Sequence, residues 1–113
     1  MLSPSMLLAA LDFRRERDWE QFHTPQNLAI AISVEAGELL EQFQWIVAPQ
    51  SRPAEERMAA IQQEVADIAI LLSYLASDLG IDIDTAVQHK LALNAKRYPV
   101  DKSRGTATKY DKL

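Results

Sequence analysis

The sequence predicts an all-α protein: a four-helix bundle-like protomer with an irregular C-terminal tail. Apolar residues make up 48% of the 113 residues and only three residues are glycine, which suits a helical protein with few tight turns. Apolar side chains recur at intervals of three and four residues over several long segments. Valine, isoleucine and threonine never alternate with polar residues over the length of a strand, so no sheet is expected.

The first two helices are marked by their start signals. A Ser-Pro pair at positions 3 and 4 predicts a helix over residues 4–19, because proline suits the first helical position. A Thr-Pro pair at positions 24 and 25 starts a second helix, predicted over residues 25–46 and stopping before Pro49. Residues 50–53 are expected to form a linker.

The second half of the chain predicts two further helices and a tail. A long helix is predicted over residues 54–79 and ends at Gly80, because glycine tolerates positive φ. Asp82 is expected to cap a fourth helix over residues 83–97. The apolar pattern then dissolves, so residues 98–113 are expected to be irregular. All 113 residues are expected to form a single domain.

The composition excludes several classes of protein. The chain has no cysteine, which excludes disulfides, thiolate metal sites and cysteine nucleophiles. A net charge of −4 does not attract nucleic acid, so no stable nucleic-acid partner is expected. Charged residues interrupt the N-terminal apolar run, and no run elsewhere is longer than that of residues 68–72. Neither a signal peptide nor a membrane partner is expected, and the chain is expected to be cytoplasmic.

Two acidic pairs lie on segments with helical apolar spacing, Glu35-x-x-Glu38 and Glu64-x-x-Asp67. Glu35 falls within the apolar stripe of the second helix, and Glu64 interrupts that of the third. Carboxylates beside a buried face are costly unless something positive lies there, and both segments lack basic partners at i±4. Hard divalent cations take oxygen ligands. The four carboxylates therefore predict a Mg²⁺ site, in which Mn²⁺ can substitute.

The alternative is that these acids form a solvated helix face, which is the usual fate of one such pair. The presence of two pairs beside apolar stripes favours a metal. The second and third helices also carry extra apolar residues, which suggest a partner chain. These residues are Ile30, Val34, Ile70, Leu71 and Tyr74.

The fourth predicted helix carries polar residues that suit phosphate. Lys90, Asn94 and Arg97 follow i, i+4, i+7 spacing and therefore share one face. An ammonium, an amide and a guanidinium can all donate to phosphate oxygens. The alternative is a solvated face whose C-terminal cations favour the helix dipole.

The remaining candidates are aromatic residues near the second helix and cations in the tail. Trp19, His23 and Trp45 flank that helix, and aromatic faces there could stack on a nucleobase. Core packing is the alternative fate of a tryptophan. Arg104 and Lys109 lie in the tail, which is either a phosphate-binding loop or a frayed terminus.

An ordered set of motifs from Phe13 to Tyr110 resembles the MazG type of all-α nucleoside triphosphate pyrophosphohydrolases. Within that family, the sequence is most similar to the small single-domain dCTP pyrophosphatase branch. The motifs are Arg17-Asp18-Trp19-Glu20-Gln21-Phe22-His23, Glu35-x-Gly37-Glu38-Leu39, Phe43-Gln44-Trp45, Glu64-x-x-Asp67, Lys90 with Asn94, Arg97-Tyr98-Pro99, Ser103-Arg104-Gly105 and Lys109-Tyr110.

The resemblance implies a role for most of these candidates. It implies that the four carboxylates of the two acidic pairs bind Mg²⁺. It implies that Trp19, His23 and Trp45 help to form a pocket for the base and sugar. The residues implied to approach the phosphates are Lys90, Asn94, Arg97 and Tyr98, and we expect Arg104 and Lys109 to join them. A homotetramer of two tight dimers is implied, with a dimer as the fallback, and active sites that draw on neighbouring chains.

The resemblance also implies an activity: hydrolysis of a nucleoside triphosphate at the α-phosphorus to the monophosphate and pyrophosphate. The expected substrate is dCTP or a modified dCTP, with dATP as a further candidate, in housecleaning of the nucleotide pool. Glu38 is favoured over Glu35 as the group that takes a proton from water. Base choice stays open, since the branch has histidine and tyrosine where this chain has Ala10 and Leu71.

Two alternatives to this activity stay open. One is an enzyme with the same metals that acts on dUTP or on a phosphoribosyl nucleotide. The other is a non-catalytic helical module for oligomerisation or regulation.

Overall fold

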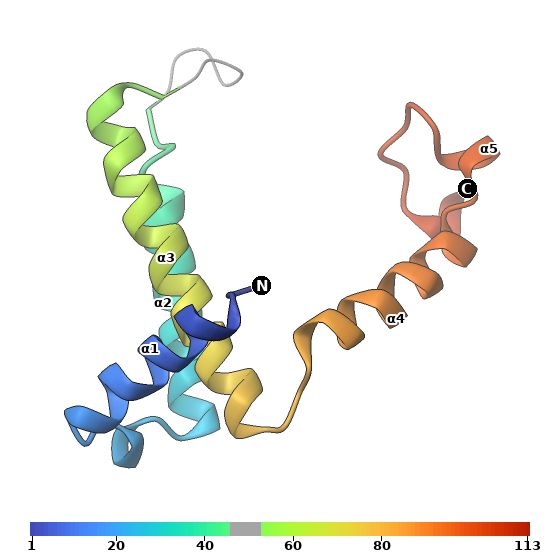
Figure 1. The fold of residues 1–113 in the computed structure, drawn as a ribbon. Coiled ribbons are helices and arrows are strands. Elements are labelled where there is room, and N and C mark those ends of the chain that lie inside the picture. The colour runs from blue at the N-terminus through green and yellow to red at the C-terminus, as the bar shows by residue number, and fades with distance from the viewer. Residues whose placement is uncertain (46–52) are drawn as a thin grey trace. The chain divides into compact units, whose positions relative to one another are not determined.

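The computed structural model describes residues 1–45 and 53–113, and this part of the chain is helical and contains no strand (Figure 1). The predicted all-α class is therefore confirmed. The elements in chain order are α1 (Pro4–Glu16), the 3₁₀ turn η1 (Glu20–Phe22), α2 (Pro25–Glu41), α3 (Glu55–Asp78), α4 (Ile83–Arg97), α5 (Val100–Ser103) and the 3₁₀ turn η2 (Tyr110–Lys112).

The predicted helix starts are confirmed, with side-chain caps on the first two. The Ser3 hydroxyl accepts a hydrogen bond from the Met6 backbone N–H at 3.2 Å, and Thr24 does the same for Asn27 at 3.2 Å. In both helices a proline follows the cap. These caps satisfy backbone donors that a helix leaves unpaired at its first turn.

The predicted ends of the first two helices are wrong. The first helix was expected to reach residue 19 but ends at Glu16, because Asp18 takes a φ of 53°, which breaks the helical path. α2 ends at Glu41 rather than near residue 46, and the following N–H groups bond three residues back in tight turns. The stop before Pro49 and residues 50–52 of the linker lie outside the described residues.

The later elements agree with the prediction except in the tail. α3 and α4 lie within one residue of their predicted bounds, and Gly80 has the expected positive φ of 67°. The tail was expected to be irregular but contains α5 and η2, each too short for apolar periodicity to indicate.

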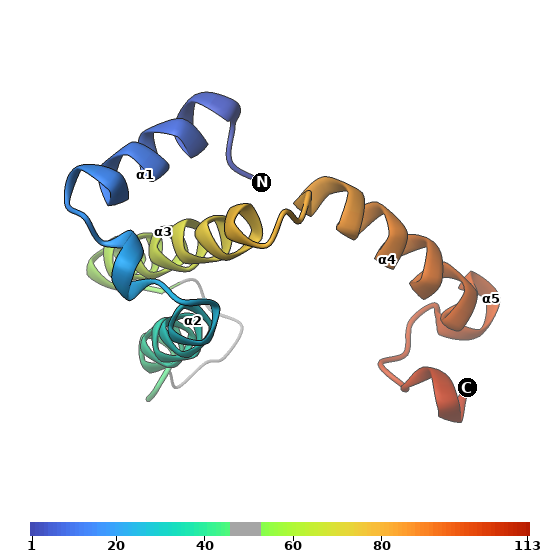
Figure 2. The ribbon, with the colours of Figure 1, turned by 90° about the horizontal axis from the view of Figure 1, so that it is seen from below.

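The described chain divides into two compact units, residues 1–80 and 81–113. In the first unit, α2 and α3 are antiparallel neighbours and α1 lies across α3 (Figures 1 and 2). Its core contains Leu28, Tyr74 and Ala76. The second unit contains α4, α5 and η2. The four-helix bundle arrangement, the single domain and the dimer of dimers stay predictions.

The extra apolar residues of α2 and α3 meet different fates. Ile30 and Val34 of α2 are 52% and 53% exposed, which is consistent with the expected partner chain. Tyr74 of α3 is buried, and Ile70 and Leu71 are half-buried. These three α3 side chains line a pocket beneath α1 within the chain, and the partner contact expected of them stays a prediction.

α3 is the one described helix that is long and apolar enough to cross a membrane by length and composition alone. Core helices of globular proteins pass the same measure. α3 contacts both α1 and α2, and it carries Glu64 and Asp67 near its middle. Within the first unit, 11% of the most apolar 18-residue stretch of this helix is buried.

Candidate functional site

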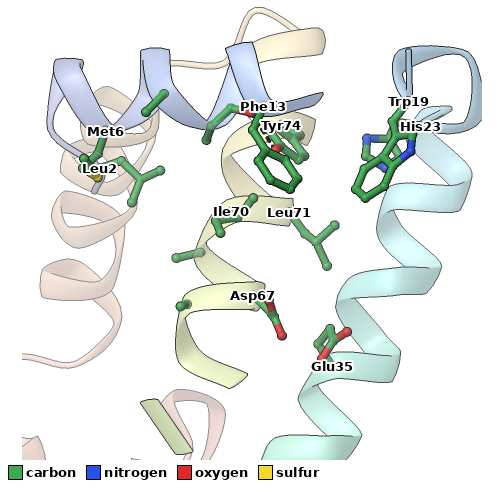
Figure 3. A pocket seen from close by; sticks show the side chains of 14 residues that line it. Leu2, Met6, Phe13, Trp19, His23, Glu35, Asp67, Ile70, Leu71 and Tyr74 are labelled. Carbon is green, nitrogen blue, oxygen red and sulfur yellow. Dashed lines mark hydrogen bonds between the residues drawn. The ribbon is translucent and has the colours of Figure 1, made fainter. Parts of the chain in front are cut away.

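Three carboxylates from two helices gather at the interface of α2 and α3. Glu35 comes from α2, and Glu64 and Asp67 come from α3, where a spacing of three residues places them on one helix face. One carboxylate oxygen from each residue lies within 4.8 Å of the others. Figure 3 shows Asp67 and Glu35 on facing sides of the gap between the two helices. The arrangement could place three oxygen ligands around one cation.

Among the described residues, no ion pair with a basic side chain balances the charge of Glu35 and Glu64. Glu35 Oε2 and Glu64 Oε2 are buried and have no hydrogen-bond partner among residues 1–45 and 53–113. The adjacent Glu64 carboxylate, followed by burial and by Glu38, raises the pKa of Glu35 to about 7. Orphaned, mutually repelling carboxylate oxygens fit a hard divalent cation. The residues present therefore fit a divalent metal ion, and Mg²⁺ stays a prediction.

Glu38 is the fourth predicted ligand and lies outside this close group of three oxygens. It follows Glu35 by one turn of α2 and is half-buried. It is near enough to contribute to the raised pKa of Glu35. Its roles as a metal ligand and as a proton acceptor stay predictions.

A pocket of about 600 Å³ adjoins the carboxylates within the first unit (Figure 3). Its wall is mostly apolar and comes largely from α1 and α3, and two members of the carboxylate cluster, Glu35 and Asp67, line one end. The lining residues are Leu2, Met6, Ala9, Ala10, Phe13, Trp19, His23, Glu35, Ala66, Asp67, Ala69, Ile70, Leu71 and Tyr74. An apolar pocket that ends in carboxylates suits a ligand with one apolar end and one metal-binding end.

Two of the three predicted base-binding residues meet at this pocket. The Trp19 and His23 rings are in edge contact, with centroids 6.4 Å apart. His23 Nδ1 is buried and has no partner in the described part of the chain. Burial and then the Arg14 charge, opposed by Asp78, hold the pKa of His23 below its ordinary value. The imidazole is thus held toward its neutral form, with one buried nitrogen that the described residues leave without a hydrogen-bond partner.

Trp45 is not among the residues that line this pocket. It follows the end of α2, is 89% exposed and has a φ of 64°. Packing into the core of this chain, the alternative weighed for it, is therefore wrong. Its role at a base or sugar stays a prediction.

The predicted phosphate-binding residues all belong to the second unit. On α4, Lys90 and Arg97 are exposed and Asn94 is half-buried. The Arg97 guanidinium lies 4.6 Å from the centre of the Tyr110 ring, which in turn contacts Tyr98 edge to face. In the tail, Arg104 and Lys109 are exposed. Phosphate binding by these six residues stays a prediction.

A part-buried ion pair beside the pocket was not predicted from the sequence. Arg14 of α1 donates two hydrogen bonds to Asp78 at the end of α3, at 2.9 and 2.8 Å. A signal was present, since Arg14 falls at i+7 of the stripe Leu7, Ala10, Leu11, and Asp78 at i+7 of the stripe Leu71, Tyr74, Leu75. A charge that interrupts an apolar stripe was the same signal that indicated Glu35 and Glu64.

The sequence is similar to those of several curated proteins. It is 48% identical over 106 residues to dCTP pyrophosphatase 1 of Mus musculus and 43% identical over 106 residues to that of Homo sapiens. Each match covers 90% of this chain and 62% of the relative. The chain therefore spans about three fifths of the length of the curated relatives it matches.

A solved structure and a family model agree with these relatives. The chain resembles the crystal structure of a pyrophosphatase from Archaeoglobus fulgidus, with a TM-score of 0.79 and 37% identity, over 84% of this chain and 90% of that one. The model of the MazG-like family matches residues 30–113, which include all four predicted metal ligands and the whole of α4. The chain belongs to the MazG-like family.

Proposed function

We propose that this protein is a Mg²⁺-dependent pyrophosphohydrolase that converts a deoxynucleoside triphosphate to its monophosphate and pyrophosphate. The observation that carries the proposal is the cluster of Glu35, Glu64 and Asp67 at one end of an apolar pocket that also contains Trp19. The names of the similar proteins support dCTP as the substrate. A modified dCTP and dATP are further substrates within the proposal, in housecleaning of the nucleotide pool.

The residues that would hold Mg²⁺ are Glu35, Glu64 and Asp67, and Glu38 is proposed to complete the set. Bound Mg²⁺ supplies positive charge against the triphosphate and makes water a better nucleophile. Glu38 is proposed to accept the proton of the attacking water, because it lies one turn from Glu35 and is partly open to solvent. The other carboxylates then stay free to bind metal.

The pocket would hold the base and sugar. Trp19 and His23 offer aromatic ring surface at the pocket wall, on which a base could stack. The Tyr74 hydroxyl lies on the same wall but already donates to the Ala10 carbonyl at 2.7 Å. With few free polar groups on this wall, shape and stacking would choose the base more than hydrogen bonds would, which supports acceptance of more than one base.

The phosphates are assigned to the second unit in this proposal. The residues are Lys90, Asn94, Arg97, Tyr98, Arg104 and Lys109, which together offer cations and neutral donors to phosphate oxygens. We also propose that four chains assemble as a dimer of dimers in the cytoplasm. The exposed Ile30 and Val34 support burial of α2 against a second copy.

Release of pyrophosphate tests the proposal directly. The panel consists of the four dNTPs, the four NTPs and 5-modified dCTPs, each with Mg²⁺ and then with EDTA. We expect release from dCTP or a related dNTP that EDTA abolishes. Silence across the panel, with no Mg²⁺-dependent binding of nucleotide, would contradict the proposal and favour a non-catalytic module.

A pair of variants then tests the carboxylates. Glu38→Gln is expected to lower turnover at least about a hundredfold while circular dichroism keeps the helical signal, since general base catalysis contributes factors of that order. Glu56→Gln removes an exposed glutamate from the first turn of α3 and should leave turnover unchanged. Full activity in Glu38→Gln would remove Glu38 from the mechanism.

A further inference from the structure

An ion pair whose arginine is buried and whose aspartate is partly exposed lies behind the wall of the pocket. Arg14 is 4% exposed, and its two terminal nitrogens donate to the two carboxylate oxygens of Asp78. Two parallel bonds fix the plane of the guanidinium as well as its position. Neither Arg14 nor Asp78 is among the residues that line the pocket.

The ion pair reaches the pocket through Tyr74. The Arg14 guanidinium carbon lies 4.5 Å from the centre of the Tyr74 ring, a cation–π distance. The Tyr74 hydroxyl donates to the carbonyl of Ala10, one turn earlier on α1. Tyr74 of α3 is therefore held to α1 at two points, by its ring and by its hydroxyl.

Tyr74 in turn contacts the ring of His23. The two ring centroids are 5.5 Å apart at an interplanar angle of 32°. His23 and Tyr74 both line the pocket. His23 also contacts the ring of Trp19. A continuous series of contacts thus runs from Arg14 through Tyr74 to His23.

Stability alone explains this ion pair poorly. An ion pair with a buried member is often no better for stability than apolar side chains of similar size, because the buried charge loses its water, as Arg14 does here. Arg14 also buries its Nε without a partner among the described residues, which adds a further penalty. What the pair does provide is a fixed orientation for the ring beside it.

We propose that Arg14, held by Asp78, is a positioning residue that fixes Tyr74 and, through it, His23 against the nucleoside of the substrate. The inference rests on the proposed function, since it takes the pocket to hold the base and sugar. Arg14 itself does not touch the substrate. Its charge also helps to keep His23 neutral, which is consistent with this placement.

Arg14→Lys is the first test, because lysine keeps the charge but cannot make two parallel bonds or lie flat on a ring. For the dNTP that the wild-type protein hydrolyses fastest, we expect KM to rise about tenfold with kcat within about twofold. Inhibition by inorganic triphosphate, which has no nucleoside, should keep its constant. A merely structural defect would change both constants or the active fraction instead.

A second variant covers the case in which Arg14→Lys does not fold. The double substitution Arg14→Met with Asp78→Leu replaces the ion pair with apolar side chains, which proteins often tolerate. We expect it to fold, to raise KM as the lysine variant does, and to displace the His23 ring signals in NMR spectra of the nucleotide-free protein. Arg15→Lys, at an exposed position next along α1, is the matched control and should change neither quantity.

The outcomes separate this inference from the function on which it rests. An active wild-type protein whose variants keep both KM and the His23 signals would overturn the positioning role and leave the proposed function intact. A wild-type protein with no Mg²⁺-dependent hydrolysis or binding of nucleotide would overturn the proposed function, and the positioning role would fall with it. A raised KM that Arg15→Lys also shows would overturn the assignment to Arg14.

Discussion

The first unit buries charge in two places that differ in how the charge is balanced. At the Arg14–Asp78 pair, a cation and an anion meet through two hydrogen bonds. At the carboxylate cluster, Glu35 and Glu64 bury oxygens that have no partner in the described chain. Both lie on helical stripes that are otherwise apolar. A charge that is paired within the chain can fix the positions of neighbouring side chains, whereas buried charges without a partner indicate a bound ligand.

Loss of one charge should change the free energy of unfolding in opposite directions at the ion pair and at the carboxylate cluster. The change at the ion pair should be the larger one. Arg14→Met leaves Asp78 without its partner and is expected to lower the free energy of unfolding by about 2 kcal/mol, less than for a fully buried pair because Asp78 is 29% exposed. Urea unfolding measures it. Arg15→Met, on the exposed side of α1, is the control, and an equal loss there would show that the pair itself adds nothing.

Loss of a charge from the carboxylate cluster should stabilise the metal-free protein. Glu35→Gln removes repulsion from Glu64 and is expected to raise the free energy of unfolding by about 1 kcal/mol at pH 8 in EDTA, a modest figure because the site is partly open to solvent. The same substitution should remove the rise in melting temperature that Mg²⁺ causes in the wild-type protein. Destabilisation of the Glu35→Gln protein in EDTA would show that the carboxylates of the cluster do not repel one another.

The stability of the metal-free protein should depend on pH through the carboxylate cluster. The pKa of Glu35 is raised from 4.5 to about 7, so the folded state binds more protons than the unfolded state between these values. Stability should therefore fall as pH rises from about 4.5 to about 7 in EDTA. Unfolding across that window measures it. Glu35→Gln should flatten this slope, and so should saturating Mg²⁺, which replaces the proton as the balancing charge.

At the ion pair, stability should instead fall as the pH is lowered, and this is the smallest of the expected effects. The bonds from Arg14 lower the pKa of Asp78 below its ordinary value of 3.8. Its contribution is present above that value and is lost as pH falls through the lowered pKa. Between about pH 5 and about pH 2, the melting temperature should show this loss in the wild-type protein and not in Asp78→Asn. The same dependence of melting temperature on acidic pH in both proteins would show that Asp78 does not cause the loss.

Local signals in the sequence were sufficient for the helices and for the acidic cluster. Ser3 and Thr24 before prolines, and Gly80 after α3, act within one or two turns of backbone, so their effects can be read without knowing the fold. A carboxylate such as Glu35 within an apolar stripe is visible in the same local way. All-helical structure and a candidate metal site were therefore predictable.

Tertiary structure decided which of these side chains meet. Glu35 joins Glu64 only because α2 and α3 pack as antiparallel neighbours, and Arg14 reaches Asp78, 64 residues away, only because α1 lies across α3. Helix periodicity states which face a residue occupies but not which helix covers that face. The pocket and the network behind it depend on that crossing, so they are properties of the packed helices rather than of any single one.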